Sequence, residues 1–256
     1  MGLRLMKSWR KRCETRLRKN NMYPISLSVF FPCYNEEQNV EQLVIDALQA
    51  LNGLVRQYEI LIINDGSSDN TGVIANALQQ KHNTVRAIHH DTNKGYGAAL
   101  ISGFRNAEYE YVFFTDGDNQ FYISEIELLL KELGAADGVL GFRKNRKDPW
   151  HRIWYSRSWN MLVRIMFGLR VKDLNCAFKI IKKQFLDKIV LNSSGAMITA
   201  ELLIRLKIAG ARFKEVGVTH RPRVFGTQTG GNPKVILRAF RELFLLYREI
   251  NYHNIT

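Results

Sequence analysis

The stretch FFTDGDNQF, residues 113–121, decides how the fold is read, because an apolar run ends there in two aspartates, Asp116 and Asp118. An Asp-Gly dipeptide is common turn chemistry, so a plain turn after a buried strand is one interpretation. A binding site is the other, since two carboxylates one residue apart can address one divalent cation. The stretch alone leaves both interpretations open, and the surrounding chain is needed to separate them.

From Ser26 onward, short apolar segments rich in Val, Ile and Phe alternate with amphipathic segments of helical periodicity. The expected strands cover residues 26–32, 59–65, 84–90, 111–116 and 137–142, and the expected helices cover 36–51, 68–81, 95–107 and 124–134. This order is typical of an α/β fold with a mostly parallel sheet and helices on both faces. Ligands of such sheets bind beyond the carboxyl ends of the strands, which places PCYNEE (32–37), NDGSSD (64–69) and TDGDNQ (115–120) along one edge. Three polar clusters after three strands favour a binding site over chance turns.

The 256 residues are 46% hydrophobic and 24% charged, which suits one large α/β domain with appendages and excludes general disorder. The formal charge of +13 suggests an anionic partner: nucleic acid, an acidic membrane surface or a phosphorylated substrate. Three scattered cysteines argue against a disulfide framework or a structural zinc site and suit a reducing compartment. We expect neither a transmembrane helix nor a secretory signal, because no apolar run is long enough for either.

The basic residues divide the chain into three expected parts. Residues 1–24 form a basic arm that is either disordered or a helix on an anionic membrane surface. Residues 25–232 form the main domain, in which segment 148–170 combines basic residues with three of the four tryptophans. That composition is typical of a helix at a membrane interface, and a helical lid on the core is the alternative. Residues 233–256 are expected to form a C-terminal amphipathic helix.

Several residues near the expected edge suit a nucleotide and a metal ion. Asp116 and Asp118 favour Mg²⁺ or Mn²⁺, for which Gln120 adds a neutral oxygen donor, and such a cation would neutralise a leaving diphosphate. Gly117 would let the chain bend so that both carboxylates reach one ion. Asp65 could accept hydrogen bonds from a base or ribose. The Gly-rich helix entry NKGYGAAL offers N-terminal amides and Lys94 to negative charge, although alone it is a weak signal.

In this order the pieces resemble the family 2 glycosyltransferases of the GT-A fold, and more narrowly the dolichol-phosphate mannosyltransferase and polyprenyl-phosphate glycosyltransferase branch. The resemblance spans roughly residues 26–231 and is carried by VFFPCYNEEQNV, ILIINDGSSDNT, NKGYGAALISGF, FFTDGDNQF, GFRK, DLNCAFKIIKK and EVGVTHRPRVFGTQTGG. It implies metal-dependent, inverting transfer of a sugar from a nucleotide-sugar donor to a polyprenyl phosphate. Where the branch usually has Ser, Gly and Arg, this chain has Cys176, Ala177 and Lys179, which leaves the sugar open between GDP-mannose and UDP-glucose types.

The resemblance also implies roles for single residues. The residues expected to line the nucleotide-sugar pocket are Pro32, Tyr34, Glu36 and Asp65, with Lys94, Asp116 and Arg223 near the donor diphosphate. Asp116, Asp118 and Gln120 match the metal-binding D-x-D-x-Q of the family, and Asp118 is expected to be essential for catalysis. Arg143 and Arg157 sit where the branch binds the lipid phosphate. Asp173 would orient the acceptor or act as a weak base, or else pair structurally with a neighbouring arginine or lysine.

The acceptor separates the remaining hypotheses. A phosphate monoester is already anionic at neutral pH and needs positioning by arginines rather than a base. The alternative is transfer to a saccharide hydroxyl, as in cell-envelope polysaccharide or glycolipid synthesis, which requires a carboxylate base. Asp173 or Glu201 would supply it, although Glu201 reads more simply as an acid on a helix surface.

Two further classes fit less well. A sugar-phosphate nucleotidyltransferase would open with a Gly-rich loop where this chain has PCYNEE. A non-enzymatic membrane- or nucleic-acid-binding protein would not need the acidic residues at the expected sheet edge, and the sequence has no nucleic-acid motif. We therefore expect a cytoplasmic enzyme, peripheral on the cytoplasmic face of a membrane, whose partners are a nucleotide sugar, a polyprenyl phosphate and anionic lipid.

Overall fold

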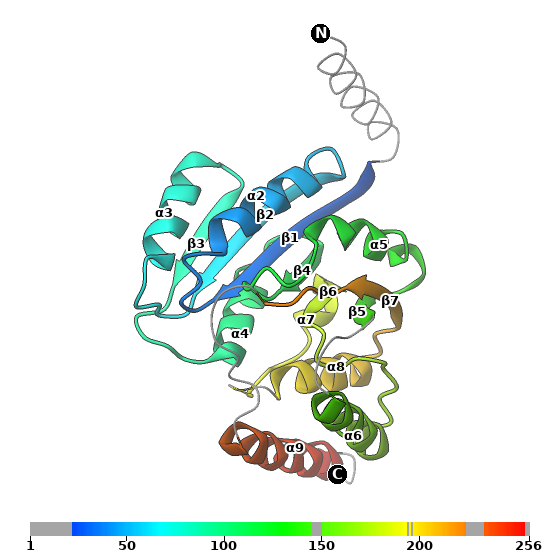
Figure 1. Ribbon diagram of the computed structural model, residues 1–256. Coiled ribbons are helices and arrows are strands. Elements are labelled where there is room, and N and C mark those ends of the chain that lie inside the picture. The colour runs from blue at the N-terminus through cyan, green and yellow to red at the C-terminus, as the bar shows by residue number, and fades with distance from the viewer. Residues whose placement is uncertain (1–21, 145–149, 194, 196, 224–232, 254–256) are drawn as a thin grey trace.

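The computed structural model describes residues 22–144, 150–193, 195, 197–223 and 233–253 of the chain. They form a seven-stranded sheet with helices on both faces (Figure 1). The strands are β1 (Tyr23–Cys33), β2 (Val55–Asn64), β3 (Val85–His89), β4 (Tyr111–Thr115), β5 (Gly138–Lys144), β6 (Phe178–Lys182) and β7 (Phe213–Thr219). The helices are α2 (Val40–Leu51), α3 (Thr71–Lys81), α4 (Tyr96–Asn106), α5 (Ile126–Leu130), α6 (Trp150–Phe167), α7 (Lys183–Leu186), α8 (Ile198–Ile208) and α9 (Pro233–His253), with 3-10 turns η1 (Ile123–Glu125) and η2 (Leu133–Ala135).

The sheet is mixed but mostly parallel, as predicted. The strand order is β3-β2-β1-β4-β6-β5-β7, in which β6 runs antiparallel to β4 and β5 while the other neighbours are parallel. In the parallel register, Cys33 pairs with Asn64 and Phe30 pairs with Phe114. The carboxyl ends of β1, β2 and β4 therefore lie at one edge of the sheet.

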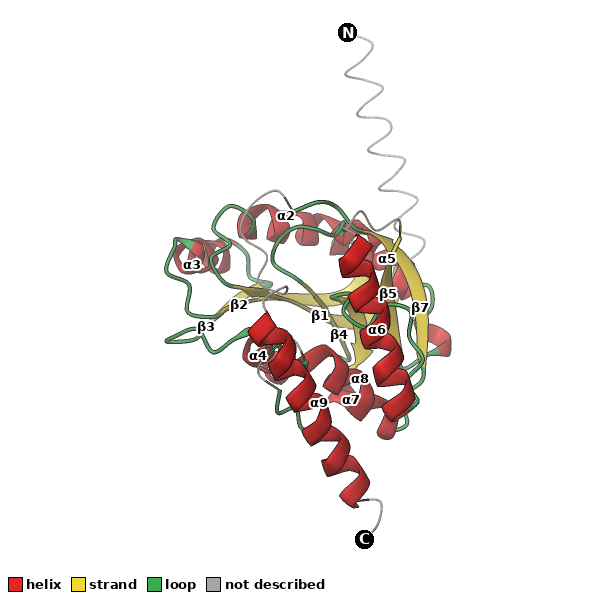
Figure 2. Ribbon diagram, turned by 60° about the horizontal axis from the view of Figure 1, so that its bottom comes forward, coloured by secondary structure: helices red, strands yellow, loops and turns green. Residues whose placement is uncertain are grey.

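The central strands are apolar on both sides because each side faces a separate helix layer. Alternate residues of β1 point to opposite faces, so that Val29 and Phe31 join the core under α2 and α3 while Phe30 joins the core under α4 and α8. Figure 2 shows α2 and α3 on one side of the sheet and α4, α8 and α9 on the other. Phe30, Phe104 and Phe114 contact one another with ring centroids 5.1–5.5 Å apart.

The last helix packs on the second layer. The Trp159 ring of α6 meets the Phe240 ring of α9 edge to face at 5.4 Å, and Phe167 meets Tyr247 in the same way at 5.7 Å. Arg205 of α8 also pairs with Glu249 at 3.0 Å. The C-terminal helix α9, which the sequence predicts to be amphipathic, therefore packs against the protein along one side. None of the described helices is both long and apolar enough to cross a membrane.

Some expectations from the sequence differ from the structure. The single helix expected over 124–134 is broken into η1, α5 and η2. The first strand begins at Tyr23, inside the expected arm, and residues 1–21 of that arm lie outside the described residues. The expectation that Glu201 lies on a helix surface is wrong, because α8 is buried on nearly every side and Glu201 with it.

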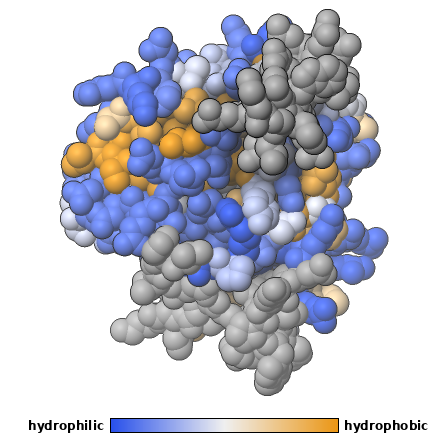
Figure 3. All heavy atoms as spheres, turned by 45° about the horizontal axis from the view of Figure 1, so that its top comes forward, coloured by the Kyte–Doolittle hydropathy of each residue, from blue (hydrophilic) through white to orange (hydrophobic). Residues whose placement is uncertain are grey.

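Figure 3 shows a face of the molecule on which hydrophilic residues dominate and hydrophobic residues gather toward one side.

The close contact of α4 with β1 gives a testable prediction. A Cβ added at Gly103 would lie 2.3 Å from two ring atoms of the fully buried Phe30. We expect Gly103→Ala to lower the free energy of unfolding in urea by about 1–3 kcal/mol through overpacking. Gly134→Ala is the matched control, because nothing lies within 4 Å of its added Cβ. Equal stability of the two variants would contradict this packing.

Candidate active site

Polar segments meet where β1, β2 and β4 end. The Asp65 N–H donates to the carbonyl of Cys33 at 2.9 Å, which joins the ends of β2 and β1. Asp116 follows the last residue of β4, a strand with all five residues buried. The edge that the sequence predicted for the three polar clusters is therefore present.

Asp116 and Asp118 form the electrostatic centre of this edge. Burial, followed by the charge of Asp118, raises the pKa of Asp116 to about 7, and the Tyr96 hydroxyl opposes that rise by donating to Asp116 Oδ1 at 2.8 Å. Burial also raises the pKa of Asp118, whose Oδ1 accepts the Gln120 N–H at 3.1 Å. These two neighbouring carboxylates, of which Asp118 is buried and Asp116 half-buried, make with their raised pKa values a site that favours a cation.

The turn that presents the two acids has a different geometry from the expected one. The left-handed residue is Asn119, with φ of 58°, and not Gly117. Gly117 is needed for close approach instead, because a Cβ there would lie 2.8 Å from both Cys33 Sγ and the Pro32 carbonyl oxygen. Glycine at this position therefore lets the turn pack against the end of β1.

The loops after β1 and β2 are joined by hydrogen bonds into one wall. The Asn35 N–H donates to Ser67 Oγ at 3.0 Å, and Asn35 Oδ1 accepts the Ser68 N–H at 2.9 Å. Asn35 itself has φ of 55°, a left-handed conformation that asparagine tolerates. Beside it Tyr34 is 47% exposed, which leaves its ring accessible for stacking, whereas Pro32 is buried within β1.

Asp65 is buried and holds the entry of α4. Its Oδ1 accepts the Lys94 N–H at 2.9 Å and contacts His90 Nδ1 at 2.6 Å, while its Oδ2 accepts the Gly95 N–H at 2.9 Å. His90 Nε2 in turn lies 2.8 Å from Ser102 Oγ. The amides expected to meet negative charge thus meet the Asp65 carboxylate. Contact of Asp65 or Lys94 with a nucleotide stays a prediction.

Arg223 lies beside both the first loop and Asp118. Its Nη2 pairs with Glu36 Oε1, and its Nη1 lies 3.6 Å from Asp118 Oδ2. Burial raises the pKa of Glu36, and hydrogen bonding to Asn39 and the Arg223 charge oppose that rise. Arg223 is therefore near the place expected for the donor diphosphate, and residues 224–232 of its loop lie outside the described residues.

The sequence analysis missed Arg221, which fastens the segment after β7 to the Asp116–Asp118 turn. Its N–H donates to the Gln120 carbonyl at 2.8 Å, and Gln120 Nε2 donates to the Arg221 carbonyl at 2.9 Å. Its guanidinium donates to Asn119 and lies 4.2 Å from the centre of the Tyr122 ring. About a hundred residues separate the two segments, so local sequence patterns carry no signal of this contact. The role of Gln120 as a metal ligand stays a prediction.

Asp173 is engaged by Arg143 in a two-bond pair. Arg143 Nε donates to Asp173 Oδ2 at 2.7 Å, and Nη2 donates to Oδ1 at 2.9 Å. Nearby Lys179 is fully buried, which lowers its pKa, and it donates to the carbonyls of Leu174 and Cys176. Of the readings open for Asp173, this geometry favours a structural carboxylate paired with arginine.

The remaining candidates lie on the helices. Arg157, expected at the acceptor phosphate, is exposed on α6. Glu201 accepts hydrogen bonds from the Asn192 and Ser193 amides and from Arg205 Nε at 2.7 Å. Both carboxylates that the sequence offered as general bases are therefore held by arginines.

Comparison with known proteins identifies the family. Residues 28–194 match the family described as glycosyl transferase family 2. The chain belongs to glycosyltransferase family 2. Similar folds include glucosyl-3-phosphoglycerate synthase from Mycobacterium tuberculosis with Mn²⁺, UDP and glucosyl-3-phosphoglycerate, at 20% identity and TM-score 0.62 over 84% of this chain and 76% of that one. A second structure of that enzyme, with Mg²⁺ and UDP, matches at 20% identity and TM-score 0.61 over 84% and 75%.

These similarities confirm the GT-A fold of the glycosyltransferase, and leave its branch within the family open. The solved structures named are glucosyl-3-phosphoglycerate synthases, not dolichol-phosphate mannosyltransferases. At 20% identity these structures support the fold of this chain and do not indicate its substrate.

The residues present fit a divalent cation. Asp116 and Asp118 offer hard carboxylate oxygens where a positive charge would offset the burial that raises the pKa of both and the Asp118 charge that adds to the rise at Asp116. Among the described residues, no group of three or more His, Cys, Asp or Glu could hold a metal ion. Mg²⁺ sites commonly combine one or two carboxylates with water and substrate phosphates, which is compatible with the Asp116–Asp118 pair.

The raised pKa of Asp116 predicts stability that depends on pH when metal is removed. The folded chain keeps a proton on this carboxyl to about pH 7, whereas an unfolded aspartate ionises near pH 4, so the unfolded state binds fewer protons in between. We expect the free energy of unfolding in a chelator to fall as the pH rises through that window. Asp116→Asn should flatten the fall, measured by urea unfolding at several pH values.

Asp91→Asn, which removes an exposed acid beyond β3, is the control and should keep the wild-type slope. Mn²⁺ should raise the unfolding temperature more at pH 7.5 than at pH 5, because carboxylates bind metal in their ionised form. The same slope in Asp116→Asn and wild type would show that Asp116 is not the responsible group.

Proposed function

We propose that this family 2 glycosyltransferase transfers a sugar from a nucleotide-sugar donor, of the GDP-mannose or UDP-glucose type, to a polyprenyl or dolichyl phosphate. The transfer inverts the anomeric carbon, depends on Mg²⁺ or Mn²⁺, and takes place at the cytoplasmic face of a membrane. The protein would then be similar in activity to the dolichol-phosphate mannosyltransferase branch.

One observation supports a phosphate acceptor over a hydroxyl acceptor: both candidate general bases form ion pairs with arginines. Asp173 is paired with Arg143, and Glu201 is paired with Arg205. A guanidinium bound in this way occupies carboxylate oxygens that a general base would need to accept the proton of a substrate hydroxyl. A saccharide hydroxyl needs such a base, whereas a phosphate monoester reaches the site already anionic. The two pairs therefore favour the phosphate acceptor.

On the donor side, Asp116 and Asp118 would hold the cation, which when bound supplies Lewis-acid stabilisation of the leaving diphosphate. Arg223 adds a positive charge at the same place, since it lies 3.6 Å from Asp118. The exposed ring of Tyr34 is suited to stack on the base. These groups orient the donor and stabilise the charge that develops on the diphosphate.

On the acceptor side, Arg143 and Arg157 would position the phosphate. A guanidinium matches the oxygens of a phosphate in two-bond pairs, which makes arginine suited to positioning such a group. Asp173 then acts as a positioning residue, because the two-bond pair fixes the plane of the Arg143 guanidinium.

A membrane partner is supported by the surface of α6 and α9. The exposed apolar residues of these two helices, here called the membrane-contact surface, are Met161, Ile165, Leu237, Phe240, Phe244, Leu245 and Tyr247. Arg164, Arg241 and Arg248 are exposed on the same helices. Apolar side chains beside arginines suit the interface of an anionic bilayer.

Activity tests the acceptor. Purified protein incubated with nucleotide sugars, Mg²⁺ or Mn²⁺, and a short polyprenyl phosphate should form a glycolipid that extracts into organic solvent. Asp118→Ala should form none while keeping its fold by circular dichroism. Asp173→Asn should lower kcat far less than the ~10²–10⁴-fold expected when a general base is lost. Transfer only to a soluble saccharide or another hydroxyl acceptor would refute the phosphate acceptor.

Vesicle binding tests the membrane partner. Leu237 is 73% exposed on the membrane-contact surface, and Val73 is 68% exposed on α3, away from it. We expect Leu237→Glu to weaken flotation with phosphatidylglycerol vesicles, because an acid there loses apolar burial and repels the anionic surface. Val73→Glu is the control and should float like wild type. If both variants float equally well, the membrane is met by another surface or not at all.

A further inference from the structure

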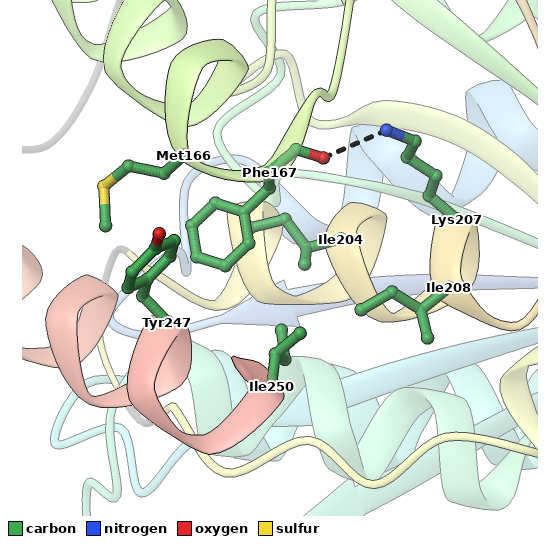
Figure 4. Close-up of a pocket in the computed structure, with 7 residues that line it drawn as sticks. All are labelled: Met166, Phe167, Ile204, Lys207, Ile208, Tyr247 and Ile250. Atoms are coloured by element: carbon green, nitrogen blue, oxygen red, sulfur yellow. Dashed lines mark hydrogen bonds between the residues drawn. The ribbon is translucent and has the colours of Figure 1, made fainter. Parts of the chain in front are cut away.

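An apolar groove lies between the C-terminal parts of α6, α8 and α9 (Figure 4). Its volume is about 270 Å³, and its lining consists of Met166, Phe167, Ile204, Lys207, Ile208, Tyr247 and Ile250. Figure 4 shows these side chains, from three different helices, around a common space. The proposed transfer chemistry does not use any of them.

The groove is open to the outside although its lining is mostly apolar. Ile208 is 62% exposed, and Tyr247 is also exposed. The only ionisable amine among the lining residues, that of Lys207, donates to the Phe167 carbonyl at 3.0 Å, where it caps the C-terminal end of α6. The lysine stem therefore lines the groove while its charge stays at the helix end. An open, apolar concavity of this kind favours an apolar ligand over a polar one.

One face of α6 links this groove to the candidate active site. Arg157, Asn160, Arg164 and Phe167 are spaced by three, four and three residues, so they lie along one side of the helix. Asn160 Nδ2 donates to the carbonyl of Lys172, the residue before Asp173. The stripe is thus basic from Arg157 to Arg164, and its last residue, Phe167, lines the groove. Ten residues of helix separate Arg157 from Phe167, which is about 15 Å.

We propose that the groove binds the isoprenoid chain of the acceptor, with the phosphate held near Arg143 and Arg157. This inference rests on the proposed function and adds to it a site for the lipid tail. A prenyl phosphate is anionic at one end and apolar along its length, which matches a stripe that is basic at one end and leads to an apolar groove. Burial of the chain there contributes affinity in proportion to the apolar area removed from water.

The proposal predicts that affinity depends on chain length through this groove. Geranyl phosphate, with two isoprene units, is too short to span from Arg157 to Phe167, whereas undecaprenyl phosphate is long enough. We expect the protein to bind undecaprenyl phosphate at least about tenfold more tightly than geranyl phosphate in the same detergent. A tenfold factor corresponds to only ~1.4 kcal/mol of binding free energy, which burial of the additional apolar area of the longer chain can supply.

Filling the groove should remove that preference. Ile208→Trp places a larger side chain at the groove, and we expect it to weaken undecaprenyl phosphate binding about tenfold while leaving geranyl phosphate binding unchanged. Val73→Trp is the matched control, because Val73 is 68% exposed on α3 and belongs neither to the groove lining nor to the membrane-contact surface. It should keep the wild-type preference. Unfolding temperatures of both variants establish that each is folded.

The outcomes separate this inference from the proposed function. If wild type binds neither prenyl phosphate more tightly than inorganic phosphate, the lipid-phosphate acceptor is wrong and the groove assignment falls with it. If both prenyl phosphates bind but Ile208→Trp and Val73→Trp behave alike, the acceptor survives and the groove is not its tail site. Equal weakening of both ligands by Ile208→Trp would likewise overturn the groove as a tail site.

Discussion

The desolvation of Asp116 and Asp118 at the end of β4, together with the effect of the Asp118 charge on Asp116, is the constraint around which the site is arranged. Burial disfavours their charged forms, and the groups that oppose this effect come from separate parts of the chain: the Tyr96 hydroxyl from α4, the Gln120 amide from the turn, and Arg223 from beyond β7. Each of these groups stabilises negative charge without neutralising the pair. The protein thus lowers the cost of two adjacent acids while keeping the site favourable for a cation.

The sheet order brings these groups together. Because β6 runs antiparallel between β4 and β5, the turn before it, which carries Asp173, comes to the same edge as Asp116. The strand β7 then leads to the segment 220–223, which attaches to the turn after β4 through the Phe121–His220 bridge and the Arg221 contacts. The second half of the chain therefore completes a site that the parallel first half begins.

The parallel strands and the polar edge could be predicted because they depend on local patterns: apolar runs buried on both faces, each followed by a polar turn. The partners of the edge residues could not. Tyr96 contacts Asp116, and Arg221 contacts Asn119, across gaps that no local periodicity spans. Asp65 was ambiguous for another reason: a carboxylate at the end of a strand has the same local sequence whether it accepts a ligand or the amides of a helix 29 residues further along the chain. Glu201 was wrongly expected on a helix surface, because a single acid in a helix sequence resembles the polar side of an amphipathic helix. The helix α8 is instead apolar around nearly its whole circumference, so its acid is buried with it.

The two buried arginine–carboxylate pairs bear on function more than on stability. A buried ion pair often contributes little net stability, since desolvation of both charges offsets their attraction. Its reliable effect is orientation: the Arg143 guanidinium lies in the plane set by Asp173, next to the turn that carries the metal-site acids. A site in which both candidate bases are paired with arginines suits a nucleophile that is already anionic and needs no base. Under the proposed function, that nucleophile would be joined to an apolar chain, which would fit a basic helical stripe that runs to an apolar groove at its far end.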